Sequence, residues 1–392
     1  MWIIHVLLLL TSVHVAMTWV LALKRGQLAR VQEVLSEEPE DAGFSRIVIL
    51  IPAWMESSTI ARCLESLIKQ TYQEWRVIVS AGGSDGTLEI AEEFAHHDER
   101  IEVIEQTPLG KNAALSDALQ LVDENIIVVL DADSVVDSNW LASLLGSLNS
   151  SFDAICGNYF PLRSTWVSES EQMAKISAYC VNQQFILQGS GSIALCRDAL
   201  LQAGGFPIDV TIGVDWDLDN RLKAEGYVCG FAPDAIVHTE RPSTMREFWE
   251  NEVRWRRAHL AAAWRHRDYH RHNPAAAMGQ LCFYLVAIAA LGALVGMPLG
   301  ALIWFFYGEP TLFALTCLCL FWIAGRRAAL AVEVAAYKAN WRLLLLAWAP
   351  IVLLFASFAT SIVAIITPRK LNKHFKGPRK TEFLAAGQQG NL

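Results

Sequence analysis

Apolar residues form both long and short runs along this chain, and the difference predicts where each part lies. Residues 2–22 are almost wholly apolar and are long enough to cross about 30 Å of hydrocarbon. A second apolar region begins near Met278 and contains three stretches, at residues 278–306, 311–325 and 343–367. Between these two regions, short apolar runs alternate with helical patterns. We therefore predict a water-exposed domain placed between membrane-spanning segments.

Basic residues next to the apolar stretches predict which side of the membrane each end faces. Lys24 and Arg25 directly follow the first stretch, whereas a cleaved signal peptide carries its positive charge before the apolar run. We therefore expect an anchor with its N-terminus outside and the following domain in the cytoplasm. The arginines at 326–327 and the basic tail at 368–392 also favour the cytoplasm. Three C-terminal crossings would leave that tail outside, so either one stretch is re-entrant or interfacial, or the first one breaks at residues 296–298.

The short apolar runs between the membrane regions have the character of buried parallel strands. They are rich in Val and Ile and lack polar alternation. The runs cover residues 46–51, 75–80, 101–105 and 125–130. Helical patterns separate them: one is capped by Ser57, Ser58 and Thr59 and ends at Gln70, and two more cover residues 87–96 and 111–121. This β-α-β order predicts a doubly wound α/β sheet whose ligands bind just after Ile51, Ser80 and Leu130.

Composition supports a membrane protein and disfavours two other classes. Of the 392 residues, 53% are hydrophobic and 18% are charged, where soluble domains carry about 25% charged residues. The net charge of −8 gives no reason to expect nucleic-acid binding. The eight cysteines include no C-x-x-C pair, so we expect reduced thiols and no zinc site.

Two carboxylates, Asp131 and Asp133, flank one residue directly after the fourth apolar run. Aspartate has low strand propensity and is costly to place at a sheet end without a partner. A divalent cation is a natural partner, because Mg²⁺ and Mn²⁺ take oxygen ligands that they share with substrate phosphates. The alternative is that Asp133 only caps a helix beginning at Ser134.

Three more turns fall at the same predicted sheet edge, and the ordered set resembles the family 2 glycosyltransferases of the GT-A fold. The turns are the P-x-x-x-E segment from Pro52 to Glu56, the G-S-D-G-T turn around Asp85 and the G-K helix start at Lys111. The resemblance implies a Rossmann-like nucleotide-sugar domain with membrane helices and a Mg²⁺ or Mn²⁺ cofactor. It places Pro52, Glu56, Asp85, Lys111 and Asp131 on the donor side.

The resemblance continues on the acceptor side. Gly189, Ser190 and Gly191 look like the family's acceptor-side loop, and the segment with Asp215 and Asp217 stands where the family has E-D-x-D-L. Asp215 would then be the general base that takes the proton of the acceptor hydroxyl, with Asp217 beside it. The implied reaction is a single inverting displacement.

A basic helical segment at residues 245–267 carries the last motif. Its Asn251-Glu-Val-Arg254-Trp255 resembles the family's Q-x-x-R-W, which implies contacts of Arg254 and Trp255 with substrate. Tryptophan and arginine at helical spacing also indicate a helix lying on an anionic membrane surface. An ordinary helix packed on the domain is the alternative. The whole resemblance spans residues 46–257.

Three departures from the family pattern affect what it implies. Ser80 and Ala81 replace aspartates, one of which normally contacts the nucleobase. The resemblance still favours a UDP-sugar donor, but the usual contact that selects the base is missing. Val214 replaces the glutamate before the proposed base. Asn251 is one methylene shorter than the usual glutamine.

We therefore expect a membrane-bound inverting glycosyltransferase that uses a nucleotide sugar and a lipid or lipid-linked glycan acceptor. A processive polysaccharide synthase is the first alternative, and a non-catalytic scaffold with a GT-A-like domain is the second. A transporter with a cytoplasmic domain is disfavoured, because its pathway would need polar residues in the spans. The expected parts are an anchor at 1–23, a cytoplasmic GT-A domain at 44–244, an amphipathic interface region at 245–272, a C-terminal transmembrane region at 278–367 and a basic cytoplasmic tail at 368–392.

Overall fold

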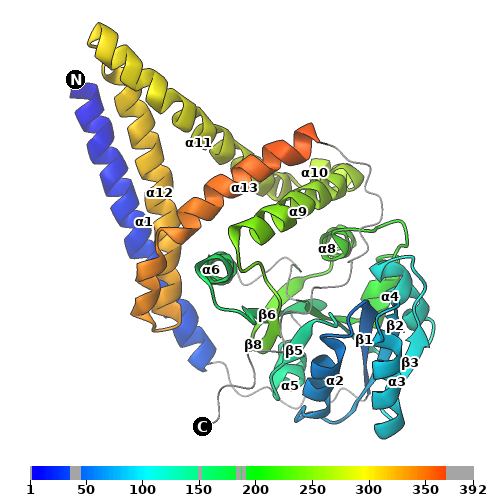
Figure 1. Ribbon diagram of the computed structural model, residues 1–392. Helices are drawn as coiled ribbons and strands as arrows, with labels where there is room; N and C mark the ends of the chain where they lie inside the picture. Colours follow the sequence, from blue (N-terminus) through cyan, green and yellow to red (C-terminus); the bar gives the residue numbers. More distant parts are fainter. Residues whose placement is uncertain (1, 36–45, 149–151, 182–186, 188–190, 368–392) are drawn as a thin grey trace, which may run out of the picture. The chain divides into compact units, whose positions relative to one another are not determined.

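The computed structural model describes residues 2–35, 46–148, 152–181, 187 and 191–367 (Figure 1). They belong to two compact units. One is an α/β unit within Pro39–Leu162 and Ile186–Glu240, and the other is a helical unit within Met1–Glu38, Arg163–Phe185 and Arg241–Pro368. The segment at 163–185, which the sequence suggested was part of the α/β domain, belongs by its contacts to the helical unit. The tail at 368–392 and the loop residues Gly189 and Ser190 lie outside the described residues.

A single eight-stranded sheet, in the order β3-β2-β1-β4-β7-β6-β8-β5, organises the α/β unit. The four strands predicted from the sequence are β1 (Ile47–Trp54), β2 (Trp75–Gly82), β3 (Ile101–Glu105) and β4 (Ile126–Leu130). They pair in parallel, as expected. Four further strands are β5 (Ser134–Val136), β6 (Ala154–Pro161), β7 (Ser192–Cys196) and β8 (Cys229–Thr239).

The added strands make the sheet mixed, which corrects the expectation of a doubly wound parallel sheet. Strand β7 is antiparallel to both β4 and β6, and β5 is antiparallel to β8. Only β8 runs parallel to its neighbour β6. Strands β5 and β8 were missed because β5 has only three residues and β8 is interrupted by Gly, Pro and Asp, so neither of the two shows an apolar run.

Helices pack against the sheet and close its core. They are α2 (Ile60–Ile68), α3 (Thr87–His97), α4 (Lys111–Leu119), α5 (Trp140–Ser147), α7 (Arg197–Gln202) and α8 (Val214–Ala224). The core holds the apolar side chains of β1, β2 and β4 together with Leu64, Leu67 and Trp140. The predicted cap of α2 is wrong in one respect: the Thr59 hydroxyl donates to Glu56 instead of accepting from a helical N–H. These helices and strands carry the candidate site at the carboxyl ends of β1, β2 and β4.

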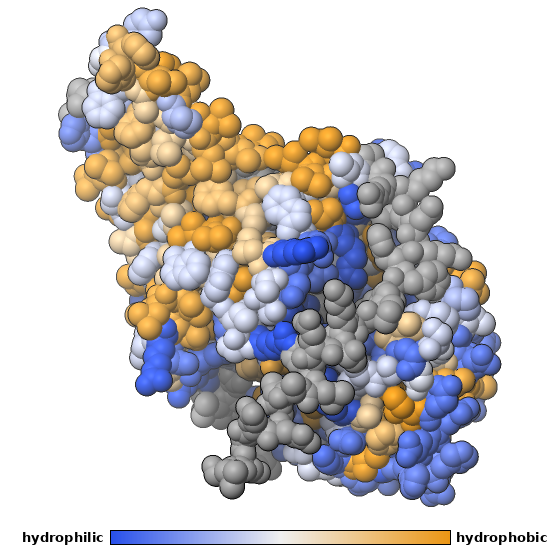
Figure 2. All heavy atoms as spheres, in the orientation of Figure 1, coloured by the Kyte–Doolittle hydropathy of each residue, from blue (hydrophilic) through white to orange (hydrophobic). Residues whose placement is uncertain are grey.

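The helical unit contains four helices that are long and apolar enough to cross a membrane, by length and composition. Figure 2 shows orange, hydrophobic side chains gathered over this part of the chain. Its helices are α1 (Trp2–Leu35), α6 (Trp166–Val181), α9 (Met245–Arg265), α10 (Arg267–His272), α11 (Pro274–Tyr307), α12 (Thr311–Tyr337), the 3₁₀-helix η1 (Trp341–Leu346) and α13 (Ala349–Ile366). The four candidates lie within α1, α11, α12 and α13.

Two expectations about these helices are corrected. Helix α11 runs unbroken through Pro298, so the break considered at 296–298 is absent. Gly296 and Gly300 lie against Thr316 and Phe313 of α12, and this close packing supports the helix around the proline. Helix α12 does not end at the arginine pair 326–327 but continues to Tyr337.

The extension of α12 is explained by a buried polar contact with α1 and α6. Glu333 is 1% exposed, and its carboxylate accepts from Arg25 Nε at 2.5 Å and from the Ser177 hydroxyl. Trp19 Nε1 also donates to the Gly325 carbonyl at 2.8 Å. A charged residue inside such a helix is therefore paired, as charges in membrane segments usually are.

Candidate active site

The Asp131–Asp133 turn follows β4 directly and is held between two strands. The Asp131 N–H donates to the Gly191 carbonyl at 2.8 Å, and the Ser134 N–H donates to the Asp131 carbonyl at 3.0 Å. Ser134 begins strand β5, so the alternative in which Asp133 caps a helix is wrong. Because Ala132 is 3% exposed, the two carboxylates project from a turn whose middle residue is anchored in the core.

Lys111 and three carboxylates form one electrostatic cluster at this sheet edge. The Lys111 ammonium, at the start of α4, donates to Asp131 Oδ1. Burial lowers the pKa of Lys111, but Asp131, then Asp215 and Asp133, raise it, and the net direction is upward. The Thr239 hydroxyl, at the end of β8, lies 3.4 Å from Asp133 Oδ1. A permanently cationic Lys111 among carboxylates suits a site for a phosphorylated ligand.

The two aspartates of α8 have different environments. Asp215 is half-buried in the first turn of α8, which follows the left-handed Gly213 (φ 66°), and its charge acts on Lys111. The Asp217 side chain is 3% exposed and forms an ion pair with Arg221 at 2.8 Å. Arg221 also donates to the Ala203 carbonyl, which ties α8 to the turn after α7. Asp217 therefore stabilises α8, whereas Asp215 contributes to the acid cluster.

Asp85 links the ends of β1 and β2. Its Oδ2 accepts from the Ser57 N–H at 3.0 Å, and its Oδ1 accepts from the Thr87 hydroxyl at 2.6 Å. Burial raises the pKa of Asp85, but the hydrogen bonds from Thr87 and Ser57 together lower it by more, so the net direction is downward. Asp85 is therefore an ionised brace of the turn in which the sequence placed donor contacts.

Glu56 and Pro52 also support the end of β1. Glu56 is 4% exposed, and its Oε2 accepts from the Thr59 hydroxyl at 3.0 Å. Pro52 pairs in register with Ser80 of β2. Ser80 is 2% exposed, and its hydroxyl donates to the Ala114 carbonyl at 3.1 Å. The position where the family usually has an aspartate thus holds a small hydroxyl that is already bonded to α4.

Cys63 is a site residue that the sequence did not reveal. It is fully buried on α2, and its thiol lies 3.8 Å from the Asp131 carbonyl oxygen. Burial, followed by the charges of Asp133, Asp131 and Glu56, raises its pKa, so the thiol stays neutral. Cys63 therefore packs as a neutral side chain against the Asp131–Asp133 turn. Its spacing on the apolar face of α2 looks like that of any core residue, so no sequence signal could have identified it.

The acid turn fits a divalent cation that is shared with a ligand. Among the described residues, no three His, Cys, Asp or Glu side chains form a complete metal cage. Asp131 and Asp133 offer two carboxylates, and Mg²⁺-type cations are commonly held by one or two carboxylates with phosphate and water as the other ligands. Gly191 (φ 64°) keeps space beside them, because a Cβ there would lie 2.9 Å from Ser134 Oγ and 3.4 Å from Asp131 Oδ2.

The Arg-Trp motif lies on α9, in the helical unit. Arg254 Nη2 donates to Asn251 Oδ1 at 3.1 Å, so the shorter amide holds the arginine within the motif. The guanidinium carbon of Arg241 lies 5.0 Å from the ring centroid of Trp255. The basic helix expected at 245–267 is confirmed as α9, which ends at Arg265.

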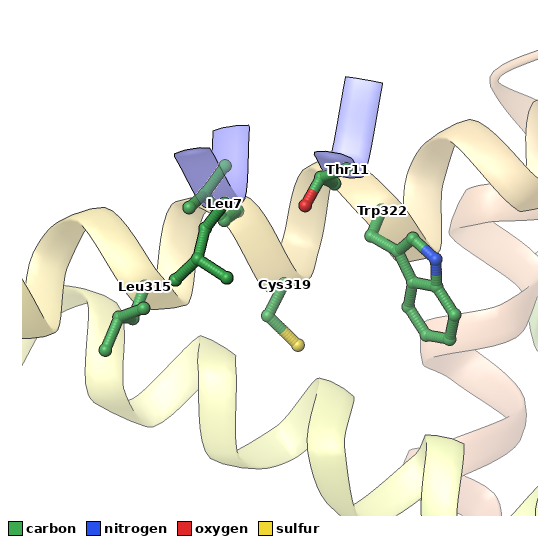
Figure 3. A pocket seen from close by; sticks show the side chains of 6 residues that line it. Leu7, Thr11, Leu315, Cys319 and Trp322 are labelled. Carbon is green, nitrogen blue, oxygen red and sulfur yellow. The ribbon is translucent and has the colours of Figure 1, made fainter. Parts of the chain in front are cut away.

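An apolar pocket of about 360 Å³ lies between α1 and α12 (Figure 3). Its lining side chains are Leu7, Thr11, Leu315, Leu318, Cys319 and Trp322. Small-molecule sites combine apolar walls with several convergent polar groups. This pocket offers only a hydroxyl, a thiol and an indole N–H, and it holds none of the chemistry described above.

Two family models match the chain. Glycosyl transferase family 2 matches residues 48–193, and Glycosyl transferase family group 2 matches residues 126–367, more than half of the chain. Glycosyltransferase AglE of Haloferax volcanii is 25% identical over 205 residues, which cover 50% of this chain and 67% of that protein. Poly-beta-1,6-N-acetyl-D-glucosamine synthase of Staphylococcus epidermidis is 26% identical over 248 residues, covering 59% of this chain and 58% of that protein.

Among solved structures, the mannosyltransferase PcManGT from Pyrobaculum calidifontis, in complex with GDP-Man and Mn²⁺, is similar with a TM-score of 0.48 and 20% identity. The match covers 84% of this chain and 98% of that one. The match covers less than two thirds of the length of several of these curated relatives.

Proposed function

The chain belongs to the glycosyl transferase family group 2, and from this premise we propose that it moves a sugar from a nucleotide-sugar donor to a membrane lipid or lipid-linked acceptor. The observation that carries the proposal is the cluster of Lys111 with Asp131, Asp133 and Asp215 at one sheet edge. The expected family and the expected fold class, an α/β GT-A domain with apolar helices, are both confirmed.

In the proposed reaction, Lys111 binds a donor phosphate as a point charge while Asp215 receives the acceptor proton. The acceptor oxygen attacks the anomeric carbon, the bond from that carbon to the diphosphate breaks, and the hydroxyl proton moves to an Asp215 carboxylate oxygen. Asp131 and Asp133 would hold a divalent cation, which would supply charge neutralisation for the diphosphate leaving group. A single displacement of this kind inverts the anomeric centre.

The donor side is proposed to hold Pro52, Glu56, Asp85, Lys111 and Asp131, and the acceptor side Gly189, Ser190 and Gly191. Asp217, buried against Arg221, acts on the acceptor side only by supporting α8. A UDP-sugar stays the favoured donor, although Ser80 and Ala81 offer no carboxylate to a nucleobase. On the helical unit, the Trp255 indole can stack on an acceptor sugar, and Arg254 can meet a phosphate.

Transfer of one or very few sugars is proposed in preference to polymer synthesis. The described residues of the helices long enough to cross a membrane are mostly Leu, Ala, Val and Ile, and such helices suit lipid better than a hydrated glycan. A polysaccharide synthase remains the rival, since one of the relatives bears that name.

Membranes containing the chain, incubated with a panel of radiolabelled nucleotide sugars, should transfer label from one donor into a lipid extract. After long incubation with excess donor, we expect product of one or very few sugars on a sizing gel. A ladder of products extending to high polymer would instead indicate a processive polysaccharide synthase. A D215N variant prepared in parallel is the control for transfer by other membrane enzymes.

The orientation proposed here has α1, α11 and α12 crossing the membrane and α13 lying at the cytoplasmic interface. Helices α1 and α12 run in the same direction, since Leu7 and Leu315 line one pocket while Arg25 meets Glu333 further along. Both then run from outside to inside, and α11 runs the opposite way. The exposed aromatic residues at 304–307 end α11, where an aromatic belt at the outer interface would lie.

Helix α13 follows the charged helix α9 along its length. Leu353 packs with Phe248 near one end of α9, and Arg257 Nη2 donates to Thr367 Oγ1 at 2.7 Å at the other end of α13. Helix α9 carries Arg246 and Glu250, whose side chains are 88% and 63% exposed, so it cannot lie in hydrocarbon. We therefore expect a helix alongside it to stay at the same level, and this placement would keep residue 367 on the cytoplasmic side.

Single cysteines at positions 309, 340 and 367, in a background without the native cysteines, test this orientation. A membrane-impermeant maleimide applied from outside should label E309C in intact cells. N340C and T367C should react only after the membrane is opened. Labelling of T367C together with E309C would mean that α13 crosses the membrane.

A further inference from the structure

A second cluster of buried charges lies in the helical unit, around Arg241. Arg241 Nε is 3.4 Å from Glu171 Oε2 of α6, and the two side chains are 13% and 8% exposed. The same guanidinium lies over the Trp255 ring of α9, with its carbon 5.0 Å from the ring centroid. One arginine thus contacts a carboxylate from one helix and an indole from another.

This arrangement depends on the shape of the guanidinium. Arginine is planar and can stack on an aromatic face while its edge N–H groups donate to a carboxylate, whereas the ammonium of lysine acts as a point charge. Both contacts lie in a region of little solvent, where electrostatic attraction is stronger than in water. The Glu171 carboxylate therefore restricts Arg241, and Arg241 restricts the orientation of the indole.

Glu171 titrates near neutral pH in this setting. Burial raises its pKa to about 7, with Arg241 acting to lower it and Glu252 to raise it. Glu252, on α9, is paired with Arg256 at 2.9 Å. Burial and then Arg256 lower the pKa of the neighbouring His259 to about 3, so this imidazole stays neutral and is not the group that changes charge.

The surrounding helices bring other charged groups near α6. Lys338, just after α12, donates to Gln172 Oε1 at 2.9 Å, and burial lowers its pKa despite the charge of Glu169. Lys175 is buried one turn further along α6.

We propose that Glu171 and Arg241 are positioning residues that hold the Trp255 indole in place for the acceptor sugar. The proposal rests on the proposed function, in which Trp255 stacks on that sugar. With Glu171 ionised, the Arg241 guanidinium is fixed and presents its face to the indole. With Glu171 neutral, the guanidinium loses its charged partner, and the indole samples other rotamers. Acceptor binding then weakens while donor binding does not change.

Steady-state kinetics on the full chain in membranes separate positioning from a general structural role. Glu171→Gln should raise the KM for acceptor roughly tenfold, as expected for loss of an ordered cation–π contact in a buried site. It should leave the KM for donor unchanged. Arg241→Lys should have the same effect. The matched control is Glu250→Gln, which removes the carboxylate of an exposed pair on α9 and should behave as the unmodified chain.

The pH profile gives a readout that a merely structural residue would not move. In the unmodified chain, the KM for acceptor should rise as the pH falls from 8 to 6, because Glu171 takes up a proton and releases Arg241. In Glu171→Gln this dependence should be absent, with the KM high throughout. Equal acceptor KM values and pH profiles for Glu171→Gln and Glu250→Gln would overturn the proposal.

Fluorine NMR of the 5-fluorotryptophan-labelled chain tests the same idea without relying on activity. The Trp255 resonance, assigned with Trp255→Phe, should shift between pH 6 and 8 in the unmodified chain and in Glu250→Gln. It should not shift in Glu171→Gln. If the shift is lost in Glu171→Gln but the unmodified chain transfers no sugar, the proposed function has failed while the positioning stands. If the Trp255 resonance behaves the same in Glu171→Gln as in the unmodified chain, the positioning role is wrong, whether or not the chain transfers sugar.

Discussion

We expect Asp215→Asn to abolish sugar transfer while the chain still binds its donor, because Asp215 is the proposed general base. A general base acts on the acceptor hydroxyl, so its loss costs about 10²- to 10⁴-fold in turnover without removing a contact to the nucleotide. Asp215 is half-buried at the start of α8, and its charge acts on Lys111 within the acid cluster. An asparagine keeps the size of the side chain but cannot hold the proton. Turnover measured beside donor affinity, by titration with the nucleotide, checks this result.

The control for this substitution lies two residues along the same helix. Asp217→Asn breaks a buried ion pair with Arg221, a change that costs about 3–5 kcal/mol of folding free energy when one partner is removed. It should lower thermal stability and the yield of folded protein, whereas Asp215→Asn should not. If Asp215→Asn lowered donor affinity in proportion to the rate, Asp215 would belong to the donor site and would not be the base.

The second large effect concerns the carboxylates after β4. Asp133→Asn and Asp131→Asn should each lower turnover by roughly a thousandfold, because a cation on the diphosphate supplies several kcal/mol of charge stabilisation. Excess chelator should abolish transfer in the unmodified chain, and added Mn²⁺ or Mg²⁺ should restore it. Asp131→Asn has a further consequence, since Lys111 loses its hydrogen-bonded partner.

Asp137→Asn is the matched control at the same part of the sheet. Asp137 Oδ1 lies 3.0 Å from His238 Nε2, and both side chains are well exposed, at 48% and 37%. Exposed pairs of this kind contribute little to stability. The variant should keep full activity and the same response to chelator. Full activity of the unmodified chain in excess chelator would remove the metal from the proposal and leave Lys111 as the group that meets the phosphates.

The pattern along the chain was sufficient for the parts whose physical environment is uniform. Strands β1, β2 and β4 are buried on both faces, so apart from Arg76 and Ser80 of β2 their positions are apolar or glycine, and the run itself identifies the strand. The parallel order then places the acid turn at the ligand edge by geometry alone. Helices α1 and α11 could be identified for the same reason, because each contains a continuous apolar stretch long enough to cross a membrane.

Where a residue's role depends on a partner distant in sequence, only the tertiary structure decided it. The resemblance separates Asp215 from Asp217 by motif position, but only the tertiary structure shows that Asp217 is buried against Arg221, which also donates to the Ala203 carbonyl. Cys63 and Thr239 reach the acid turn through the packing of α2 and the end of β8.

The same reason explains the errors at the ends of elements. Helix α12 continues past its arginine pair because Arg25, about 300 residues earlier in the chain, meets Glu333. Strand β8 forms despite its Gly, Pro and Asp residues because β6 and β5 supply hydrogen-bond partners on both sides. Local hydrophobicity is written in the sequence of each segment. The pairing of a charge, or the completion of a sheet edge, is decided by a neighbour that the segment itself does not contain.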